Sequence, residues 1–124
     1  MLQAYSINID AGADTIIPFN NISVDKGCAE KLTGVGTIEL ERAGAYLVNV
    51  NGSASASTTI QLLRNGVALP QAQSTGESVS FSTFIQVPSN NCNCNCKTSP
   101  VTIQVHNLTA VTFTNVNIVV EKID

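Results

Sequence analysis

The fold is decided by the central stretch at residues 43–71, which reads AGAYLVNVNGSASASTTIQLLRNGVALPQ. Its first part alternates between apolar and polar side chains, with Tyr46, Val48 and Val50 on one face. Alternation with a period of two residues is the pattern of a β-strand that buries one of its faces. The stretch therefore begins with a strand, which Asn51-Gly52 brings to a close.

The strongest turn signal in this stretch is the dipeptide Asn65-Gly66. Both residue types tolerate a positive φ angle, which a two-residue type I′ turn requires at both of its central positions. The pattern predicts a hairpin in which Thr58–Arg64 pairs with Val67–Gln71.

The period-two pattern continues towards both ends of the chain. Further alternating segments lie at 5–9, 15–19, 38–40, 79–87, 101–105 and 111–120. We count about eight to ten short strands separated by turns, which favours a β-sandwich or barrel. The only helix signal is one short turn at Cys28–Leu32, which Thr33-Gly34 ends.

The last segment changes phase along its length. Val111 and Phe113 share one parity, whereas the apolar residues from Val116 onwards share the other. One extra residue in a strand shifts all following side chains to the opposite face, so the pattern predicts a β-bulge near Asn115.

Composition limits the classes of protein that fit this chain. Its 124 residues are typical of one compact domain. Six basic residues against nine acidic ones give a net charge of −3, and nucleic-acid binding needs a basic surface. No run approaches the ~18 apolar residues of a membrane span, and the start shows no secretory signal pattern. We therefore expect neither nucleic acid nor membrane insertion.

Two motifs in the central stretch resemble those of the tumour-necrosis-factor and complement-globular-head superfamily. Ala43–Val50 is similar to its aG-x-Y-x-V strand, and Ile60–Gly66 to the next strand with its L-x-x-N-G turn. Glu77–Val87 resembles the following long strand, and Val116–Ile123 the closing strand. The bacterial and phage members are the most similar, among them the heads of collagen-like exosporium filaments.

The resemblance implies an all-β fold: an antiparallel β-sandwich jelly roll that forms a homotrimer. Residues 1–124 would make a single jelly-roll domain, with residues 89–98 as an inserted loop rich in Cys and Asn.

Two segments, Ala45–Val48 and Ile118–Val120, are apolar on both faces. A strand with one face in water should alternate, so two apolar faces indicate burial by a neighbouring subunit. The alternative is that Leu47 and Val119 are isolated exposed apolar residues, which are common on protein surfaces. Our expected core and trimer-interface residues are Tyr46, Leu47, Val48, Phe113, Ile118 and Val120.

Four cysteines are the candidates for covalent or metal chemistry. Cys92, Cys94 and Cys96 follow a C-x-C-x-C pattern, and Cys28 lies far away in sequence. Three outcomes stay open: disulfides to Cys28 or between subunits, a soft-metal site for Zn²⁺ or Cu(I) at Cys92, Cys94 and Cys96, or free thiols. The pattern lacks the paired C-x₂-C spacing of structural zinc sites.

No combination of residues in the sequence identifies a catalytic site. His106 is the only histidine, no G-x-S-x-G motif is present, and no acidic partner can be assigned to it. We interpret His106 as a surface residue at a strand end. Asp10 and Asp14 flank Gly12, and we interpret them as solvated carboxylates of a turn rather than as a Ca²⁺ site.

From the resemblance we expect a non-enzymatic, trimeric structural or adhesive module. It would be displayed on a bacterial spore, a cell or a phage, and would meet an unknown surface or receptor ligand. Two alternatives stay open. One is a ligand- or carbohydrate-binding module that uses loops rich in Asn, Ser and Thr; the other is soft-metal binding through Cys92, Cys94 and Cys96. We expect no cofactor other than Zn or Cu.

Overall fold

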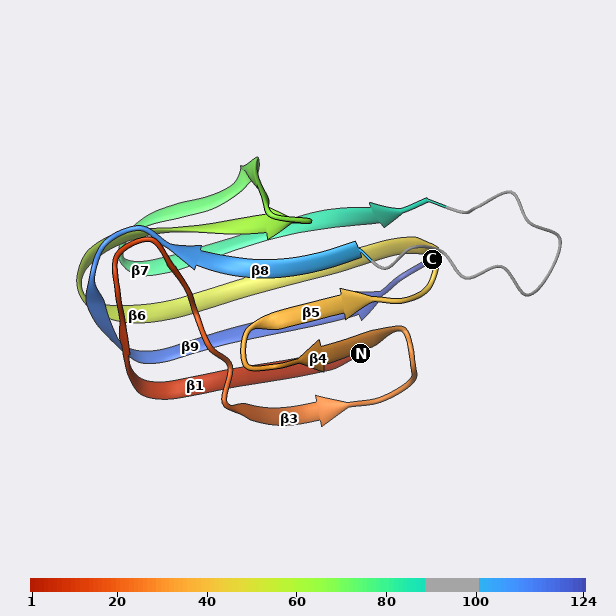
Figure 1. Cartoon of the computed structure of the whole chain (residues 1–124), viewed down its shortest axis with the longest axis horizontal. Helices are drawn as coiled ribbons and strands as arrows, with labels where there is room; N and C mark the ends of the chain where they lie inside the picture. Colours follow the sequence, from red (N-terminus) through yellow and green to blue (C-terminus); the bar gives the residue numbers. More distant parts are fainter. Residues whose placement is uncertain (89–100) are drawn as a thin grey trace, which may run out of the picture.

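The computed structural model describes residues 1–88 and 101–124, whose regular structure is entirely β (Figure 1). The strands are β1 (Leu2–Ala11), β2 (Thr15–Ile16), β3 (Asn21–Asp25), β4 (Glu30–Thr33), β5 (Thr37–Leu40), β6 (Gly44–Arg64), β7 (Val67–Val87), β8 (Val101–Asn107) and β9 (Val111–Lys122). The all-β fold class expected from the sequence is confirmed. The described residues include no helix with the length and apolarity to span a membrane.

These strands form one antiparallel sheet that curls on itself. Its order is β3-β1-β9-β6-β8-β5-β4, with β2 paired to β8 and β7 paired to β6. The curl follows from β6, which changes its neighbour along its length: residues 46–54 pair with β9, and residues 60–64 pair with β8. The long strands β6 and β7 run side by side through both parts of the curl (Figure 1).

The turn of the hairpin between β6 and β7 is confirmed, but its strands are longer than expected. Thr58 pairs with Gly76 rather than with a residue of Val67–Gln71, and β6 continues through Asn51-Gly52, where the sequence predicted a strand end. Asn65 has φ 51° and Gly66 has φ 83°, so both central residues have the positive φ of a type I′ turn. The turn is also attached to β8, because the Asn65 amide donates to the Thr102 carbonyl at 2.9 Å. In return, the Thr102 amide donates to Asn65 Oδ1 at 2.9 Å.

The bulge expected near Asn115 is confirmed as well. On β6, Ser53 pairs with Asn115 and the next residue, Ala54, pairs with Phe113. One residue of β9, Thr114, is therefore left over in this ladder. This extra residue moves the apolar side chains from Val116 onwards to the buried face, and the burial of β9 changes phase at this point.

The helical turn expected at Cys28–Leu32 is wrong. Glu30–Thr33 is strand β4, whose residues pair along β5 from Glu30 opposite Leu40 to Thr33 opposite Thr37. A single helical turn forms few hydrogen bonds for the residues that it orders, whereas the edge of β5 offers a complete ladder. The buried Glu30 carboxylate adds to this arrangement, because its Oε1 accepts the Lys122 amide of β9 at 3.0 Å and its Oε2 lies 3.0 Å from the Met1 amino group.

The apolar core lies on the inner side of the curl. It contains five of the six side chains expected at the core or the trimer interface: Tyr46, Val48, Phe113, Ile118 and Val120, each at most 1% exposed. The interior of a single chain covers these five side chains, so they are not available to an interface. Of the six, only Leu47 lies on the outer face of the sheet, where it is half-buried.

The Tyr46 hydroxyl anchors the turn that precedes β6. It donates to the Arg42 carbonyl at 2.7 Å and accepts a hydrogen bond from the Arg42 amide at 3.2 Å. Tyr46 is fully buried, whereas Arg42 is exposed, so the hydroxyl end of this contact is removed from water. A buried hydroxyl must be hydrogen-bonded to avoid a desolvation cost, and the backbone of Arg42 meets that need.

We expect Tyr46→Phe to lower the free energy of unfolding by about 1–3 kcal/mol, because it leaves backbone groups of Arg42 without a partner. Urea denaturation followed by circular dichroism measures the change. Tyr5→Phe is the matched control, because Tyr5 is half-buried and its hydroxyl has no hydrogen bond in the described residues. Equal losses in the two variants would contradict the anchoring role.

The Tyr46 hydroxyl also makes the free energy of unfolding depend on pH in the alkaline range. Burial raises the pKa of Tyr46 above its ordinary value of 10.0, against the opposing effect of the hydrogen bond with Arg42. The unfolded chain then loses this proton at a lower pH than the folded chain does. The stability that Tyr46 contributes is therefore complete below about pH 10 and is lost as the pH rises through the folded pKa. We expect Tyr46→Phe to show a shallower loss of stability above that pH in urea titrations.

Candidate functional site

The outer face of the sheet carries three large apolar side chains on the neighbouring strands β6, β7 and β9. Phe84 of β7 is 66% exposed, and Leu47 of β6 lies directly opposite it. Val119 of β9 lies opposite Asn49, which follows Leu47 on the same face of β6. We call Leu47, Phe84 and Val119 the outer apolar face; Leu47 and Val119 are half-buried.

Sequence analysis found two members of this face and missed the third. Leu47 and Val119 stood out because their segments are apolar on both faces. Phe84 was overlooked because the alternation of its strand is carried by Phe81, Ile85 and other residues of the buried parity. The available signal was a Phe among the Ser residues of the exposed parity.

Uncharged polar side chains border the outer apolar face on one side. Ser82 lies opposite Asn49, and its hydroxyl donates to Asn49 Oδ1 at 2.5 Å. On the other side, Glu121 of β9 lies opposite Leu47 and is half-buried. An apolar centre with an aromatic residue and a polar rim is the composition of a protein–protein interface.

The cysteine candidates are only partly placed. Cys28 is exposed, and its Sγ accepts a hydrogen bond from Arg42 Nη2 at 2.9 Å, which raises the pKa of Arg42. Residues 1–88 and 101–124 hold no group of three or more His, Cys, Asp or Glu side chains suited to a metal ion. Cys92, Cys94 and Cys96, with the loop at 89–98, lie outside the described residues. The disulfide, metal and free-thiol alternatives stay predictions.

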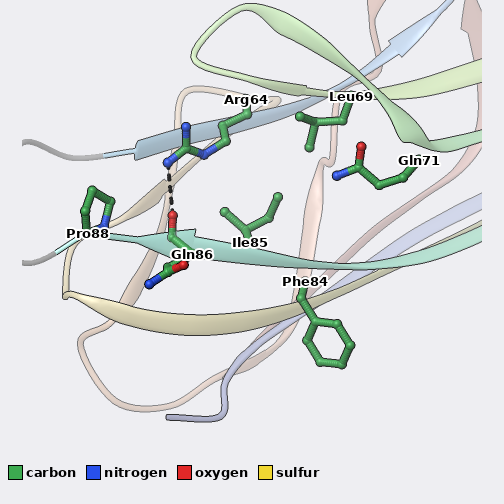
Figure 2. A pocket seen from close by; sticks show the side chains of 7 residues that line it. All are labelled: Arg64, Leu69, Gln71, Phe84, Ile85, Gln86 and Pro88. Atoms are coloured by element: carbon green, nitrogen blue, oxygen red, sulfur yellow. Dashed lines mark hydrogen bonds between the residues drawn. The ribbon is translucent and has the colours of Figure 1, made fainter.

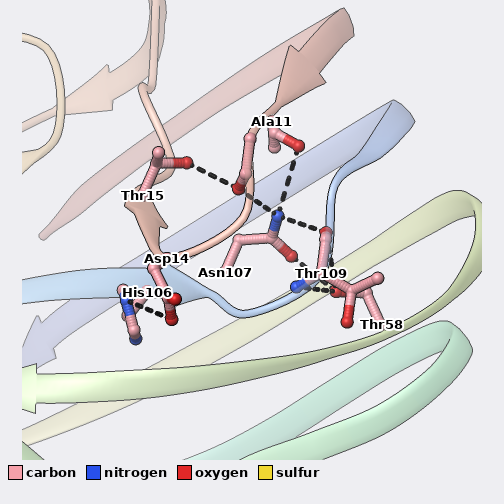
Figure 3. A network of polar contacts seen from close by, with 8 residues as sticks. Ala11, Asp14, Thr15, Thr58, His106, Asn107 and Thr109 are labelled. Atoms are coloured by element: carbon pink, nitrogen blue, oxygen red, sulfur yellow. Dashed lines mark hydrogen bonds and ion pairs between the residues drawn. The ribbon is translucent and has the colours of Figure 1, made fainter.

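His106 lies near the end of β8 beside a carboxylate that the sequence did not assign to it. Its Nε2 is 3.8 Å from Asp14 Oδ1 (Figure 3). The His106 side chain is 20% exposed and that of Asp14 is 77% exposed, so water screens the pair. In the described residues no hydrogen bond joins His106 to a serine or threonine hydroxyl, which a nucleophile–base pair would require.

Next to this pair, a buried polar network centres on Asn107 (Figure 3). The fully buried Asn107 side chain accepts the Thr58 hydroxyl at 2.6 Å. Its Nδ2 donates to the Gly12 carbonyl at 3.0 Å and to the Thr109 carbonyl at 2.7 Å. Asn107 thus joins β6, the turn after β1 and the turn before β9, and its hydrogen-bonding groups are occupied by this structural task.

A groove of about 440 Å³ lies between the two ends of β7 (Figure 2). Arg64 Nη2 donates to the Gln86 carbonyl at 2.9 Å across it. The side chains of Ile85 and Leu69 lie on the same side of the end of β7, whereas the Phe84 ring lies on the opposite side, away from Arg64 (Figure 2). The groove is lined by Arg64, Leu69, Gln71, Phe84, Ile85, Gln86 and Pro88.

In comparisons with known proteins, no family model and no curated protein matches this chain. The resemblance to trimeric jelly rolls therefore stays a hypothesis.

We expect Asn107→Ala to lower the free energy of unfolding by about 1–3 kcal/mol, because it removes the buried hydrogen bonds that the Asn107 amide makes to the Thr58 hydroxyl and to the Gly12 and Thr109 carbonyls. Chemical denaturation followed by circular dichroism measures this loss. Asn51→Ala is the control, since Asn51 is exposed on β6 and a surface substitution changes stability by about 0.5 kcal/mol or less. A comparable change in both variants would contradict the role of Asn107 in joining the two turns to β6.

Proposed function

We propose that this chain is a non-enzymatic structural or adhesive module that assembles into a homotrimer through its outer apolar face. The observation that carries the proposal is the position of Phe84, 66% exposed and directly opposite Leu47 on the neighbouring strand. A largely exposed aromatic side chain, with another large apolar side chain beside it, favours burial against a partner.

Leaving the outer apolar face in contact with water costs free energy. Burying a Phe or Leu side chain stabilises by about 1.5–3 kcal/mol. The rim is formed largely by uncharged groups such as Asn49 and Ser82, so covering the face desolvates few charges. Aromatic residues are enriched at the centres of interfaces and acidic or lysine side chains are depleted there.

A jelly-roll sandwich is the finer architecture that we propose for the curled sheet. β6 pairs with β9 in its first part and with β8 in its second. A strand shared in this way between two parts of a sheet is compatible with two packed layers around one core. The homotrimer is taken from the resemblance at Ala43–Val50 and Ile60–Gly66.

The non-enzymatic part of the proposal rests on what the polar side chains are used for. The Asn107 network holds two turns against β6. The Glu30 carboxylate is buried against the Lys122 amide and the Met1 amino group. Display on a bacterial spore, a cell or a phage follows from the resemblance to bacterial and phage members, where such trimers serve as exposed heads or tips.

We expect the wild-type chain to be a trimer in size-exclusion chromatography with light scattering, and Phe84→Ser to shift it to monomer. Val67→Ser is the matched control, because Val67 is 67% exposed but lies at the β6–β7 turn, away from the outer apolar face. Far-ultraviolet circular dichroism verifies that both variants fold.

Two outcomes would contradict the proposal. A wild-type monomer at micromolar concentration would remove the trimer altogether. A trimer that Phe84→Ser leaves intact would show that the subunits associate through another surface.

A further inference from the structure

Strand β7 forms an edge of the curled sheet, since in the described part of the chain it pairs only with β6. The direction of its backbone groups follows from two contacts. The Gln86 carbonyl accepts a hydrogen bond from Arg64 Nη2, and the Ser80 amide donates a hydrogen bond to Ser74 Oγ at 3.1 Å. Both residues are even-numbered, and alternate residues of a strand direct their amide and carbonyl to opposite sides. The even-numbered residues therefore present their backbone groups at the free edge.

The middle of this edge is available for pairing. The amides and carbonyls of Ser82 and Phe84 have no strand partner among the described residues, and the Phe84 carbonyl has only a 3.5 Å contact with the Thr83 hydroxyl. Residues two apart that each offer one donor and one acceptor match the hydrogen-bonding repeat of an antiparallel ladder.

Within its own sequence, Ser78–Val87 lacks the features that usually protect an edge strand, and side chains from outside it occupy only the Ser80 amide and the Gln86 carbonyl among the contacts described. Proteins block such edges with proline, charged side chains or bulges. The first half of β7 contains Pro70, whereas Ser78–Val87 contains neither proline nor a charged residue. It also pairs with β6 without a register shift, from Ser53 opposite Ser78 to Gly44 opposite Val87.

The groove beside this edge supplies selectivity for a side chain. It reaches Gln86 and Pro88 at the end of β7, and Arg64 is the one charged residue among those that line it. A guanidinium group favours a carboxylate as its partner, because the two groups match in charge and geometry. The Ser78–Val87 segment of a second copy has no acidic residue to offer, which favours a different strand as the occupant.

We infer that Ser78–Val87 is a strand-addition site, which binds an extended peptide segment with an acidic side chain directed at Arg64. Backbone hydrogen bonds along Ser82 and Phe84 would supply affinity, and the groove would supply specificity, as in other strand-addition complexes. This site uses the edge of β7, whereas the proposed trimer uses side chains on the outer face, so the inference goes beyond the proposed function.

The test uses a fluorescein-labelled peptide of alternating Thr and Val with one central Asp, blocked at both ends, and measures fluorescence anisotropy. We expect saturable binding to the wild-type chain, and binding weaker by about tenfold when Lys replaces the Asp. Arg64→Gln removes that preference. A peptide N-methylated at alternate residues loses binding, because it cannot donate to the carbonyls of the edge.

Ser82→Pro tests the same edge from the side of the protein. It removes an amide that faces away from β6, so the β6–β7 ladder keeps its hydrogen bonds. We expect peptide affinity to fall by about tenfold or more, whereas Ser82→Ala, which keeps the amide, leaves affinity unchanged. If Ser82→Pro fails to fold, the N-methylated peptide tests the same hydrogen bonds on the wild-type chain.

Failure of this inference is distinguishable from failure of the trimer. Leu47→Ser changes the outer apolar face on β6 and leaves the edge of β7 and the residues that line the groove intact, so it retains peptide binding whatever its oligomeric state. The inference is overturned if the Asp peptide does not bind at millimolar concentration, or if it binds Ser82→Pro as tightly as wild type. It is also overturned if Ser82→Pro changes only the oligomeric state, since the edge then pairs with a second copy.

Discussion

The structure depends on one constraint, which is that β6 must serve as a central strand twice. Its first part pairs with β9 and its second part with β8, while β7 follows it on the other side. A strand that changes neighbours in this way forces the sheet to curl, and the inner side of the curl becomes the core. Tyr46, Val48 and Ile60 of β6 all lie there, fully buried.

Polar groups at the boundaries of the core complete this arrangement. Tyr46 holds the turn before β6, Glu30 receives the Lys122 amide of β9, and Asn107 joins two turns to β6. Every buried side-chain nitrogen or oxygen of the described residues has a hydrogen-bond partner. Because these groups are committed to the fold, binding is more readily explained by the outer surfaces of the sheet than by its interior.

Strand β7 offers two such surfaces at right angles to each other. The side chain of Phe84 belongs to the outer face, next to Leu47, whereas its amide and carbonyl belong to the free edge. A sheet face binds a partner through the apolar area that is buried, and it does not require a particular direction of the partner's backbone. An edge binds through a ladder of hydrogen bonds and requires an extended partner. One residue would therefore take part in both of the proposed associations, which differ in chemistry and can be separated by substitution.

The sequence by itself determined the features that depend on neighbours along the chain. Period-two alternation identified the strands other than β3 and β4, Asn65-Gly66 identified the hairpin turn, and the change of parity identified the bulge near Asn115. Only the tertiary structure decided that Glu30–Thr33 is a strand, because pairing with β5 outweighs the local helix signal. It also placed Asp14 beside His106 and left Phe84 exposed. Alternation shows that a strand has two different faces, but which face is covered and which edge stays unpaired depends on strands that are distant in the sequence.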